Sequence, residues 1–330
     1  MKNITIIGAG EAGFTFACLV REKNKDAVIT VIDQKPRYID KKKLITQLDF
    51  KAYVDLKEWA QNLGITFIQD KVERLNVERG KIYCKENEPI DFELLVVAAG
   101  SLPNKLVIKG DHKDGLFYLS ELDPLTLKDT LKISSEVLVY VSTVLGLELS
   151  FVLRALGKEV RIVADNFNFL ENFQQEILEL LQEAAVAVHT GAAIEEVIGE
   201  DGVRATKITP LKVFSSDAVF VDSGFLPNAA LFENTVTVRD AFFTNYDNVY
   251  VLGDMNCQDI SSERVFAFNC EEVKAQAHSL AEIIVQVQPV SYHKKQHSVE
   301  DKQNYLMQMA QRWRQQIKTG GLSVKQEGKL

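Results

Sequence analysis

The stretch ITIIGAGEAGFTFA, residues 4 to 17, decides the fold. Its apolar start, Ile4 to Ile7, predicts a short strand, and a helix is expected from Glu11 to about Lys23. The turn between them has three glycines with the spacing GxGxxG, at Gly8, Gly10 and Gly13. A strand, a glycine turn and a helix in this order predict the first half of a dinucleotide-binding βαβ unit.

Each glycine of this turn has a separate physical task. Gly8 allows a tight bend that a Cβ would obstruct, Gly10 lets the backbone come close to a pyrophosphate, and Gly13 lets the helix pack closely on the strand. The N–H groups and the dipole at the helix N-terminus then favour the phosphates. The next expected strand, Val28 to Ile32, ends at Asp33, whose carboxylate can accept hydrogen bonds from ribose hydroxyls.

Length and composition indicate a globular protein. A chain of 330 residues is longer than one ordinary core holds, so we expect two domains. No apolar run approaches a membrane span, and MKNITIIGAG begins a strand at once, with no room for a signal peptide. A cytoplasmic location is therefore expected, and a peripheral contact with the inner face of a membrane stays open.

The charge argues against one class of partner. A net charge of −8 does not favour general nucleic-acid binding. The charge is uneven, because eight Lys/Arg and three Asp/Glu from Lys294 onwards give a net +5 and leave −13 on the remainder.

Cysteine and histidine patterns exclude several kinds of site. The four cysteines form no CxxC pair and no metal-ligand cluster, so we expect reduced thiols and no metal at Cys18, Cys84, Cys257 and Cys270. The five histidines give neither an HExxH motif nor zinc spacing. No side chain stands out as a proton-transfer group, so no catalytic residue is assigned.

Three later segments resemble those of a known family. FELLVVAAGSLPN (residues 92–104) resembles the mid-chain strand and turn of two-dinucleotide flavoproteins, with alanine in the usual threonine place of their ATG triplet. VFVDSGFLPN (219–228) resembles their GxxPN return segment, and NVYVLGDMNC (248–257) resembles their second flavin segment. In order and spacing, residues 1 to 287 resemble the FAD-dependent pyridine nucleotide–disulfide oxidoreductase superfamily. Within it they are nearest to type II NADH dehydrogenases and related NADH oxidases that lack a redox disulfide.

The resemblance implies an α/β fold with two Rossmann-like dinucleotide-binding domains, the second inserted in the first. It places the FAD-binding domain at residues 1–105 and 241–290, the NAD(P)H-binding-like domain at 106–240 and a helical tail at 291–330. A helix from about Ser262 to Val287 would direct its N-terminus at the flavin.

The resemblance also implies how FAD would lie. Its pyrophosphate would lie on residues 8–13, its adenosine ribose on Asp33 and its ribityl chain near Gly253 and Asp254. The lysine run 41–43 would either lie near the flavin and stabilise its reduced form, or be a solvated charged loop. The complete set of expected cofactor-binding residues is Gly8, Gly10, Glu11, Ala12, Gly13, Asp33, Gln34, Lys43, Val72, Ala99, Gly100, Gly253 and Asp254.

A second βαβ pattern repeats the first at an offset of about 133 residues, in VLVYVSTVLGLELS (residues 137–150). A strand over 137–141, a helix over 146–156 and a strand over 159–164 that ends at Asp165 are expected. The positions of Gly8, Gly10 and Gly13 correspond here to Val141, Thr143 and Gly146. Only the glycine for helix–strand packing remains.

The lost glycines predict a damaged phosphate cradle in an otherwise intact fold. Forcing the β-branched Val141 into the positive φ of a glycine would cost on the order of 1–3 kcal/mol. Thr143 puts a side chain where a pyrophosphate would lie, although its hydroxyl and that of Ser142 could still bond a phosphate oxygen. Glu148 either lies near the nicotinamide, as the resemblance implies, or is an exposed helical acid. Tight NAD(P)H binding is left open.

Three functions follow as expectations. The favoured one is an FAD-dependent oxidoreductase resembling an NAD(P)H dehydrogenase, with hydride passing from nicotinamide to flavin and electrons passing on to a quinone, oxygen or another small acceptor. The damaged second turn keeps two others open. One is an FAD-binding interaction protein whose inserted domain docks a partner. The other is a flavoenzyme with a donor that is not a nicotinamide.

The tail predicts one amphipathic helix over residues 299–318, after a hinge near Gln288 and Pro289. Five apolar residues share one face of this helix: Leu306, Met309, Ala310, Trp313 and Ile317. Such a face packs on the chain's own body or in a homodimer, and a basic amphipathic helix can also bind an anionic membrane surface. Residues 320–330 are expected to be disordered.

Overall fold

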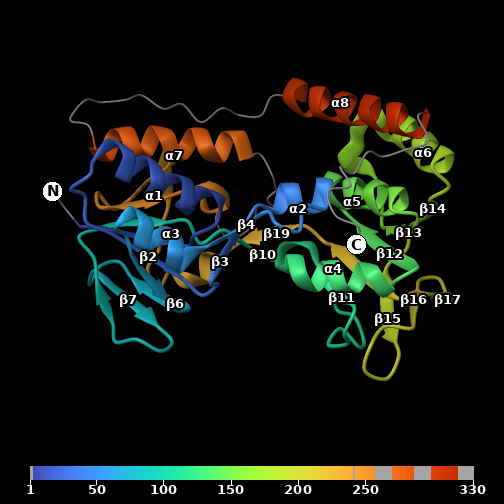
Figure 1. Ribbon diagram of the computed structural model, residues 1–330, viewed down its shortest axis with the longest axis horizontal. Coiled ribbons are helices and arrows are strands. Elements are labelled where there is room, and N and C mark those ends of the chain that lie inside the picture. The colour runs from blue at the N-terminus through green and yellow to red at the C-terminus, as the bar shows by residue number, and fades with distance from the viewer. Residues whose placement is uncertain (1–2, 241, 257–269, 286–298, 319–330) are drawn as a thin grey trace. The chain divides into compact units, whose positions relative to one another are not determined.

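The computed structural model describes residues 3–240, 242–256, 270–285 and 299–318 (Figure 1). The chain divides into two compact units. Unit 1 is Met1–Asp40, Tyr53–Leu102 and Phe225–Lys295, and unit 2 is Lys41–Ala52, Pro103–Gly224 and Gln296–Leu330. Each unit has helices and a sheet whose central strands are parallel, and most of unit 2 lies in the sequence between two parts of unit 1. The predicted α/β class with an inserted second domain is therefore confirmed.

The division differs from the sequence boundaries in four places. It assigns residues 225–240 to unit 1, and it assigns residues 41–52, residues 103–105 and the tail helix to unit 2. The predicted hinge at Gln288 and Pro289, residues 262–269 of the predicted helix, and residues 320–330 all lie outside the described residues.

Unit 1 contains a seven-stranded sheet in the order β20-β21-β22-β9-β1-β2-β5. β1 pairs in parallel with β2 on one side and β9 on the other, while β20, β21 and β22 pair antiparallel at one edge. The strands are β1 (Ile4–Ile7), β2 (Ile29–Asp33), β5 (Thr66–Gln69), β9 (Leu94–Val97), β20 (Val238–Asp240), β21 (Phe243–Thr244) and β22 (Val249–Val251).

Smaller elements complete unit 1. Its helices are α1 (Glu11–Lys23), α3 (Leu56–Leu63) and α7 (Cys270–Val285), and α1 and α7 lie side by side (Figure 1). A three-stranded antiparallel sheet contains β6 (Val72–Asn76), β7 (Lys81–Cys84) and β8 (Ile90–Asp91). The two-stranded pairs are β3 (Arg37–Ile39) with β4 (Tyr53–Asp55), and β10 (Ser101–Pro103) with β19 (Phe225–Pro227).

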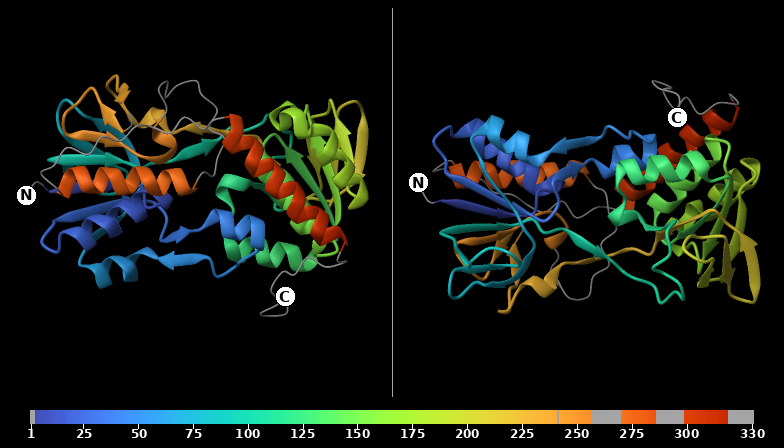
Figure 2. Two further views of the ribbon diagram at one scale, coloured as in Figure 1. Left: turned by 90° about the horizontal axis from the view of Figure 1, so that it is seen from above. Right: turned by 60° about the horizontal axis from the view of Figure 1, so that its bottom comes forward.

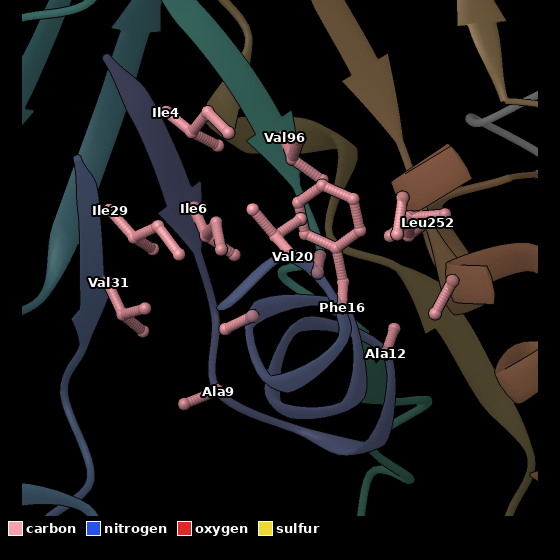
Figure 3. Close-up of a cluster of buried hydrophobic side chains, with 14 of the residues drawn as sticks. Ile4, Ile6, Ala9, Ala12, Phe16, Val20, Ile29, Val31, Val96 and Leu252 are labelled. Carbon is pink, nitrogen blue, oxygen red and sulfur yellow. The ribbon is translucent and has the colours of Figure 1, made fainter. Parts of the chain in front are cut away.

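Helix α1 is held on its sheet by one apolar stripe. Ala12, Phe16 and Val20 recur every four residues, and all three are buried. Phe16 and Val20 point at Ile6 of β1 and Val96 of β9 (Figure 3). The packing fixes the N-terminus of α1 against the end of β1, where the glycine turn lies.

Unit 2 repeats this plan with a five-stranded parallel sheet in the order β11-β18-β12-β13-β14. β12 lies between β18 and β13, as β1 lies between β9 and β2. The strands are β11 (Leu116–Tyr118), β12 (Glu136–Val141), β13 (Glu159–Ala164), β14 (Ala187–Thr190) and β18 (Ala218–Asp222). An antiparallel sheet adds β15 (Ile194–Ile198), β16 (Ala205–Ile208) and β17 (Lys212–Ser215). The helices are α2 (Lys41–Gln47), α4 (Pro124–Ile133), α5 (Val144–Ala155), α6 (Gln174–Glu183) and α8 (Val299–Lys318).

Two sequence expectations about local structure need correction. The lysine run 41–43 is not a loop, because it opens helix α2, whose Leu44 and Ile45 are buried. The second repeated helix begins at Val144 rather than Gly146, because Thr143 caps it at an earlier position.

The tail helix α8 packs within unit 2 beside α6 (Figure 2). Leu306, Met309, Ala310 and Trp313 are each at most 2% exposed, and the Trp313 ring stacks on Phe151 with centroids 3.7 Å apart. The predicted apolar face is therefore covered by the chain itself. None of the described helices is long and apolar enough to cross a membrane.

Candidate functional site

Two glycines of the first turn are required by the backbone around them. Gly8 has φ +92°, and a Cβ there would lie 2.3 Å from the carbonyl oxygen of Ala98. A Cβ at Gly13 would lie 1.9 Å from the carbonyl oxygen of Gly8. Both contacts are with backbone atoms that cannot turn aside, so a side chain at either position would open the turn.

Gly10 differs, because a Cβ there would meet no atom of the described residues within 4 Å. Gly10 is the N-cap of α1, with φ −71° and ψ −170°, and no side chain caps the helix. The first amides of a helix have no intrahelical acceptor and carry a partial positive charge. The turn therefore leaves open space in front of free donors, and this space fits the pyrophosphate of FAD.

Asp33 has a structural task that the sequence did not reveal. One oxygen, Oδ2, accepts the Ala9 N–H at 2.6 Å, and the other, Oδ1, accepts the Lys35 N–H at 2.8 Å. The carboxylate thus ties the end of β2 to the glycine turn and stands beside it. The neighbouring candidate Gln34 is exposed.

A second group of candidates gathers next to α1. A Cβ at Gly253, which has φ +64°, would lie 3.1 Å from the Cβ of Ala12, so the two segments touch. The Ser101 hydroxyl donates to Asp254 Oδ2 at 2.6 Å. The Gly253 N–H donates to Oε1 of Gln276 on α7 at 3.1 Å. Unit 1 therefore brings the first turn and the predicted second flavin segment together.

Glu11, the first residue of α1, is held by two side chains. The Tyr38 hydroxyl donates to its Oε2, and Lys274 Nζ lies 3.1 Å from its Oε1. The Tyr38 ring stacks on Phe14, which in turn stacks on Trp59, with centroids 4.5 and 4.7 Å apart. Lys274 partly neutralises the one acid at this helix N-terminus.

The remaining candidates fall in different places. Ala99 is half-buried and Gly100 has φ +65°, directly after β9. Val72 is a buried core residue at the start of β6. Lys43 lies in α2 and is assigned to unit 2, whereas the other candidates are in unit 1.

The second turn has a different backbone from the first. Val141 is the last residue of β12, and it is absent from the described non-glycine residues with positive φ, which are Leu48, Glu171, Ala185 and Leu211. The predicted strain at Val141 is therefore wrong. With glycine lost, the strand continues through this position and the chain turns later, at residues 142 and 143.

A buried aspartate occupies the N-terminus of α5. Oδ2 of Asp222, from the end of β18, accepts the N–H of Thr143 at 2.9 Å, the Thr143 hydroxyl at 2.8 Å and the Gly146 N–H at 3.0 Å. The Thr143 hydroxyl also accepts the Leu145 N–H at 3.2 Å. Asp222 is 1% exposed, and burial raises the pKa of its carboxyl despite these donors.

The hydroxyls that could have bonded a phosphate are also used within the protein. The Ser142 hydroxyl donates to the carbonyl oxygen of Asp222 at 2.6 Å, and that of Thr143 to its carboxylate. The sequence predicted a side chain in the way of a ligand. The structure instead shows an acceptor from the same chain in contact with the helix donors.

Glu148 is not an exposed acid. It is 3% exposed, its Oε1 pairs with Arg312 of α8, and it interacts with the Tyr305 hydroxyl. Burial, followed by the charge of Glu148, raises the pKa of Tyr305. The acid therefore anchors the tail helix on α5, and its predicted place near a nicotinamide stays a prediction.

The described cysteines show no activated thiol. Burial raises the pKa of Cys84 to about 11, and burial also raises that of Cys18, whose Sγ accepts the Trp59 Nε1–H at 3.4 Å. Cys257 and the side chain of Cys270 lie outside the described residues. The described part of the chain contains no cluster of His, Cys, Asp and Glu that could hold a metal ion.

The two carboxylates that flank β18 are expected to affect stability with opposite pH dependence. Backbone N–H groups of Glu136 and Ser135 hold the pKa of Asp217 below its ordinary value, whereas burial raises that of Asp222. Asp217 therefore stabilises the fold at pH values above about 3.9, the ordinary pKa of an aspartate in the unfolded chain. This stabilisation is lost as the pH falls through the lower pKa that Asp217 has in the folded protein. The contribution of Asp222 to the free energy of unfolding is fully present below about pH 3.9. It is lost as the pH rises through the higher pKa that Asp222 has in the folded protein.

Thermal unfolding between about pH 2 and about pH 8 checks this. The Tm deficit of Asp217→Asn should grow as the pH rises. The Tm of the wild type minus that of Asp222→Asn should fall over the same range. Parallel pH profiles for the two variants would contradict the assignment.

Comparison with known proteins gives one family and several relatives. The family model described as pyridine nucleotide-disulphide oxidoreductase matches residues 2–285. An NADH oxidase of Methanocaldococcus jannaschii is 25% identical over 280 residues, which cover 76% of this chain and 62% of that protein. Rubredoxin-NAD(+) reductase of Pseudomonas putida is 22% identical, with 76% of this chain and 71% of that protein covered.

Solved structures agree on the fold. A NAD-dependent persulfide reductase from A. fulgidus has a TM-score of 0.75 at 19% identity, over 88% of this chain and 60% of that one. A water-forming NADH oxidase from Lactobacillus brevis bound to NADH also has a TM-score of 0.75, at 15% identity over 89% of this chain and 71% of that one. The chain thus spans about three fifths of the first relative in each comparison.

Proposed function

The chain belongs to the family of pyridine nucleotide-disulphide oxidoreductases, and from this premise we propose that it is an FAD-dependent oxidoreductase resembling the NAD(P)H dehydrogenases of that family. The observation that carries the proposal is the open turn in unit 1. Gly10 leaves space in front of the α1 amides, and the neighbouring glycines give the turn the shape that a dinucleotide needs.

Different residues of unit 1 would bind the different parts of FAD. The N–H groups at the start of α1, from Gly10 to Gly13, would bind the pyrophosphate, with Ala12 beside Gly253 closing one side. Asp33 would accept the ribose hydroxyls, and Asp254, oriented by Ser101, would accept a ribityl hydroxyl. When bound, FAD supplies two-electron chemistry, accepting hydride from a donor and passing electrons to an acceptor.

The names of the relatives support the choice of donor and the range of acceptors. They include an NADH oxidase and a rubredoxin-NAD(+) reductase. We therefore propose NAD(P)H as the donor and a quinone, another small molecule or a small redox protein as the acceptor.

Anaerobic mixing of the FAD-loaded protein with NADH, and separately with NADPH, tests this function. We expect one of the two to bleach the flavin. A flavin that stays oxidised with both nucleotides, but is reduced by dithionite, would contradict NAD(P)H as the donor.

A second candidate is an FAD-dependent enzyme or an FAD-binding interaction protein that does not use a nicotinamide. The occupied N-terminus of α5 favours it, because the donors that would hold a second dinucleotide are bonded to Asp222. Failed bleaching together with tight FAD binding is the result that would support it.

For the tail, we propose that α8 is a structural helix of unit 2 rather than a membrane anchor. Its apolar face is buried, and Arg312 and Arg314 pair with Glu148 and Glu176. The full chain should therefore not float with vesicles of anionic phospholipid. Flotation that is lost when residues 295–330 are removed would contradict this.

A further inference from the structure

We infer that the Asp222 carboxyl group is an internal acceptor that fills the phosphate position of unit 2 and thereby weakens its binding of pyridine dinucleotides. The inference deepens the proposed function, because it concerns the donor site of the same enzyme. It rests on the register of the two sheets, the contacts of the carboxylate and a contrast between α1 and α5.

The register shows which residue Asp222 replaces. In unit 1, Ile7 of β1 pairs with Val97 of β9, so Gly8 follows beside Ala98. In unit 2, Val141, the counterpart of Gly8, pairs with Asp222 of β18. Asp222 therefore stands where the first unit has Ala98, whose methyl group neither carries charge nor accepts a hydrogen bond.

The contacts of Asp222 use the donors that a bound phosphate would need. The carboxylate accepts the N–H groups of Thr143 and Gly146, and the hydroxyl of Thr143 as well. Leu145 donates its N–H to the same hydroxyl. By contrast, no side chain caps α1 at Gly10. The two turns follow the corresponding strands β1 and β12, and each begins a helix. Among the described residues, a carboxylate accepts an N–H group of the helix itself in α5 but not in α1.

The position of the Asp222 carboxyl group also obstructs a ligand. A Cβ at Gly146 would lie 2.7 Å from Asp222 Oδ2, so the group is wedged between strand and helix and cannot swing out freely. Its Oδ1 is buried and has no hydrogen-bond partner among the described residues. A diphosphate would have to displace this carboxyl to reach the same amides, and an ionised carboxyl at this depth would also repel it because solvent screens the charge weakly.

The test measures binding and not turnover. ADP-ribose carries the diphosphate without the nicotinamide ring, so its affinity is read without electron transfer. Isothermal titration of the FAD-loaded protein would compare the wild type with Asp222→Ala, which copies Ala98, and Asp222→Asn, which keeps the shape and an acceptor. The matched control is Asp217→Asn. Asp217 also accepts two backbone N–H groups in unit 2, but it lies at the other end of β18.

We expect weak binding of ADP-ribose by the wild type and by Asp217→Asn, and binding about tenfold tighter or more in both Asp222 variants. Melting curves and flavin content show whether each variant is folded, and Asp222→Asn keeps the test informative if the alanine variant is not. Wild-type affinity equal to that of the Asp222 variants, or weaker binding in them, would overturn the inference. A flavin that neither NADH nor NADPH reduces, combined with the expected affinities, would contradict the proposed donor and leave the role of Asp222 standing.

Discussion

Replacing Gly10 by threonine is expected to lower the affinity for FAD by roughly 100-fold or more while the fold stays intact. A Cβ at Gly10 would meet no atom within 4 Å in the described part of the chain, and the backbone angles of Gly10 suit any residue. Threonine and glycine are similar as N-caps, so the apoprotein should melt at nearly the same temperature. The new side chain would occupy the space for the pyrophosphate and take two of its charged hydrogen bonds, each worth about 1.5–3 kcal/mol.

The contrast with Gly8 makes this result specific. Gly8→Ala puts a Cβ against the Ala98 carbonyl and forces a positive φ on alanine, so it should lower the melting temperature as well as FAD binding. Gly10→Thr should lower only FAD binding. Titration of each apoprotein with FAD, followed by flavin fluorescence, gives the affinities. Wild-type affinity in Gly10→Thr would show that FAD does not bind at the N-terminus of α1.

Replacing Trp313 by alanine is expected to lower the free energy of unfolding by about 3–5 kcal/mol, the usual cost of removing a buried aromatic side chain. Trp313 is 2% exposed and stacks on Phe151 of α5. Its loss would leave a cavity between the tail helix and unit 2.

Met307 of the same helix provides the control, because it is 42% exposed. Met307→Ala should change stability by less than about 0.5 kcal/mol. Urea unfolding followed by circular dichroism compares the three proteins. Equal stability of Trp313→Ala and the wild type would mean that α8 does not pack on the rest of unit 2 in solution. The apolar face of α8 would then be available to bind a membrane or a second copy of the chain.

The first turn was predictable from sequence because local sterics determine it. Gly8 and Gly13 each face a backbone carbonyl too close for a Cβ, so the spacing of the glycines reports a shape directly. The apolar stripe of α1 and the alternation of strands and helices likewise follow from short-range patterns.

The second turn was only half predictable. The loss of two glycines was visible in the sequence, but the strain assigned to Val141 assumed that the backbone kept the shape of the first copy. The structure avoids that strain by extending β12. A conformation read from one copy need not hold in another once the residues that require it are gone.

The contacts between distant segments could not be read from local patterns. Asp222 is 76 residues from Gly146, and Arg312 is 164 residues from Glu148, so each pair meets only when the sheets and helices pack. One signal for Asp222 was present, since it replaces Ala98 at the end of an otherwise apolar strand. A charged residue in that position indicates a partner at the adjoining helix N-terminus.

The most direct test of the central claim is a crystal structure of the FAD-loaded protein soaked with excess ADP-ribose. The account predicts the FAD diphosphate against the N–H groups of residues 10–13, with Asp222 still bonded to Thr143 and Gly146. Diphosphate density on the α5 amides with Asp222 displaced, or FAD bound away from the first glycine turn, would contradict it.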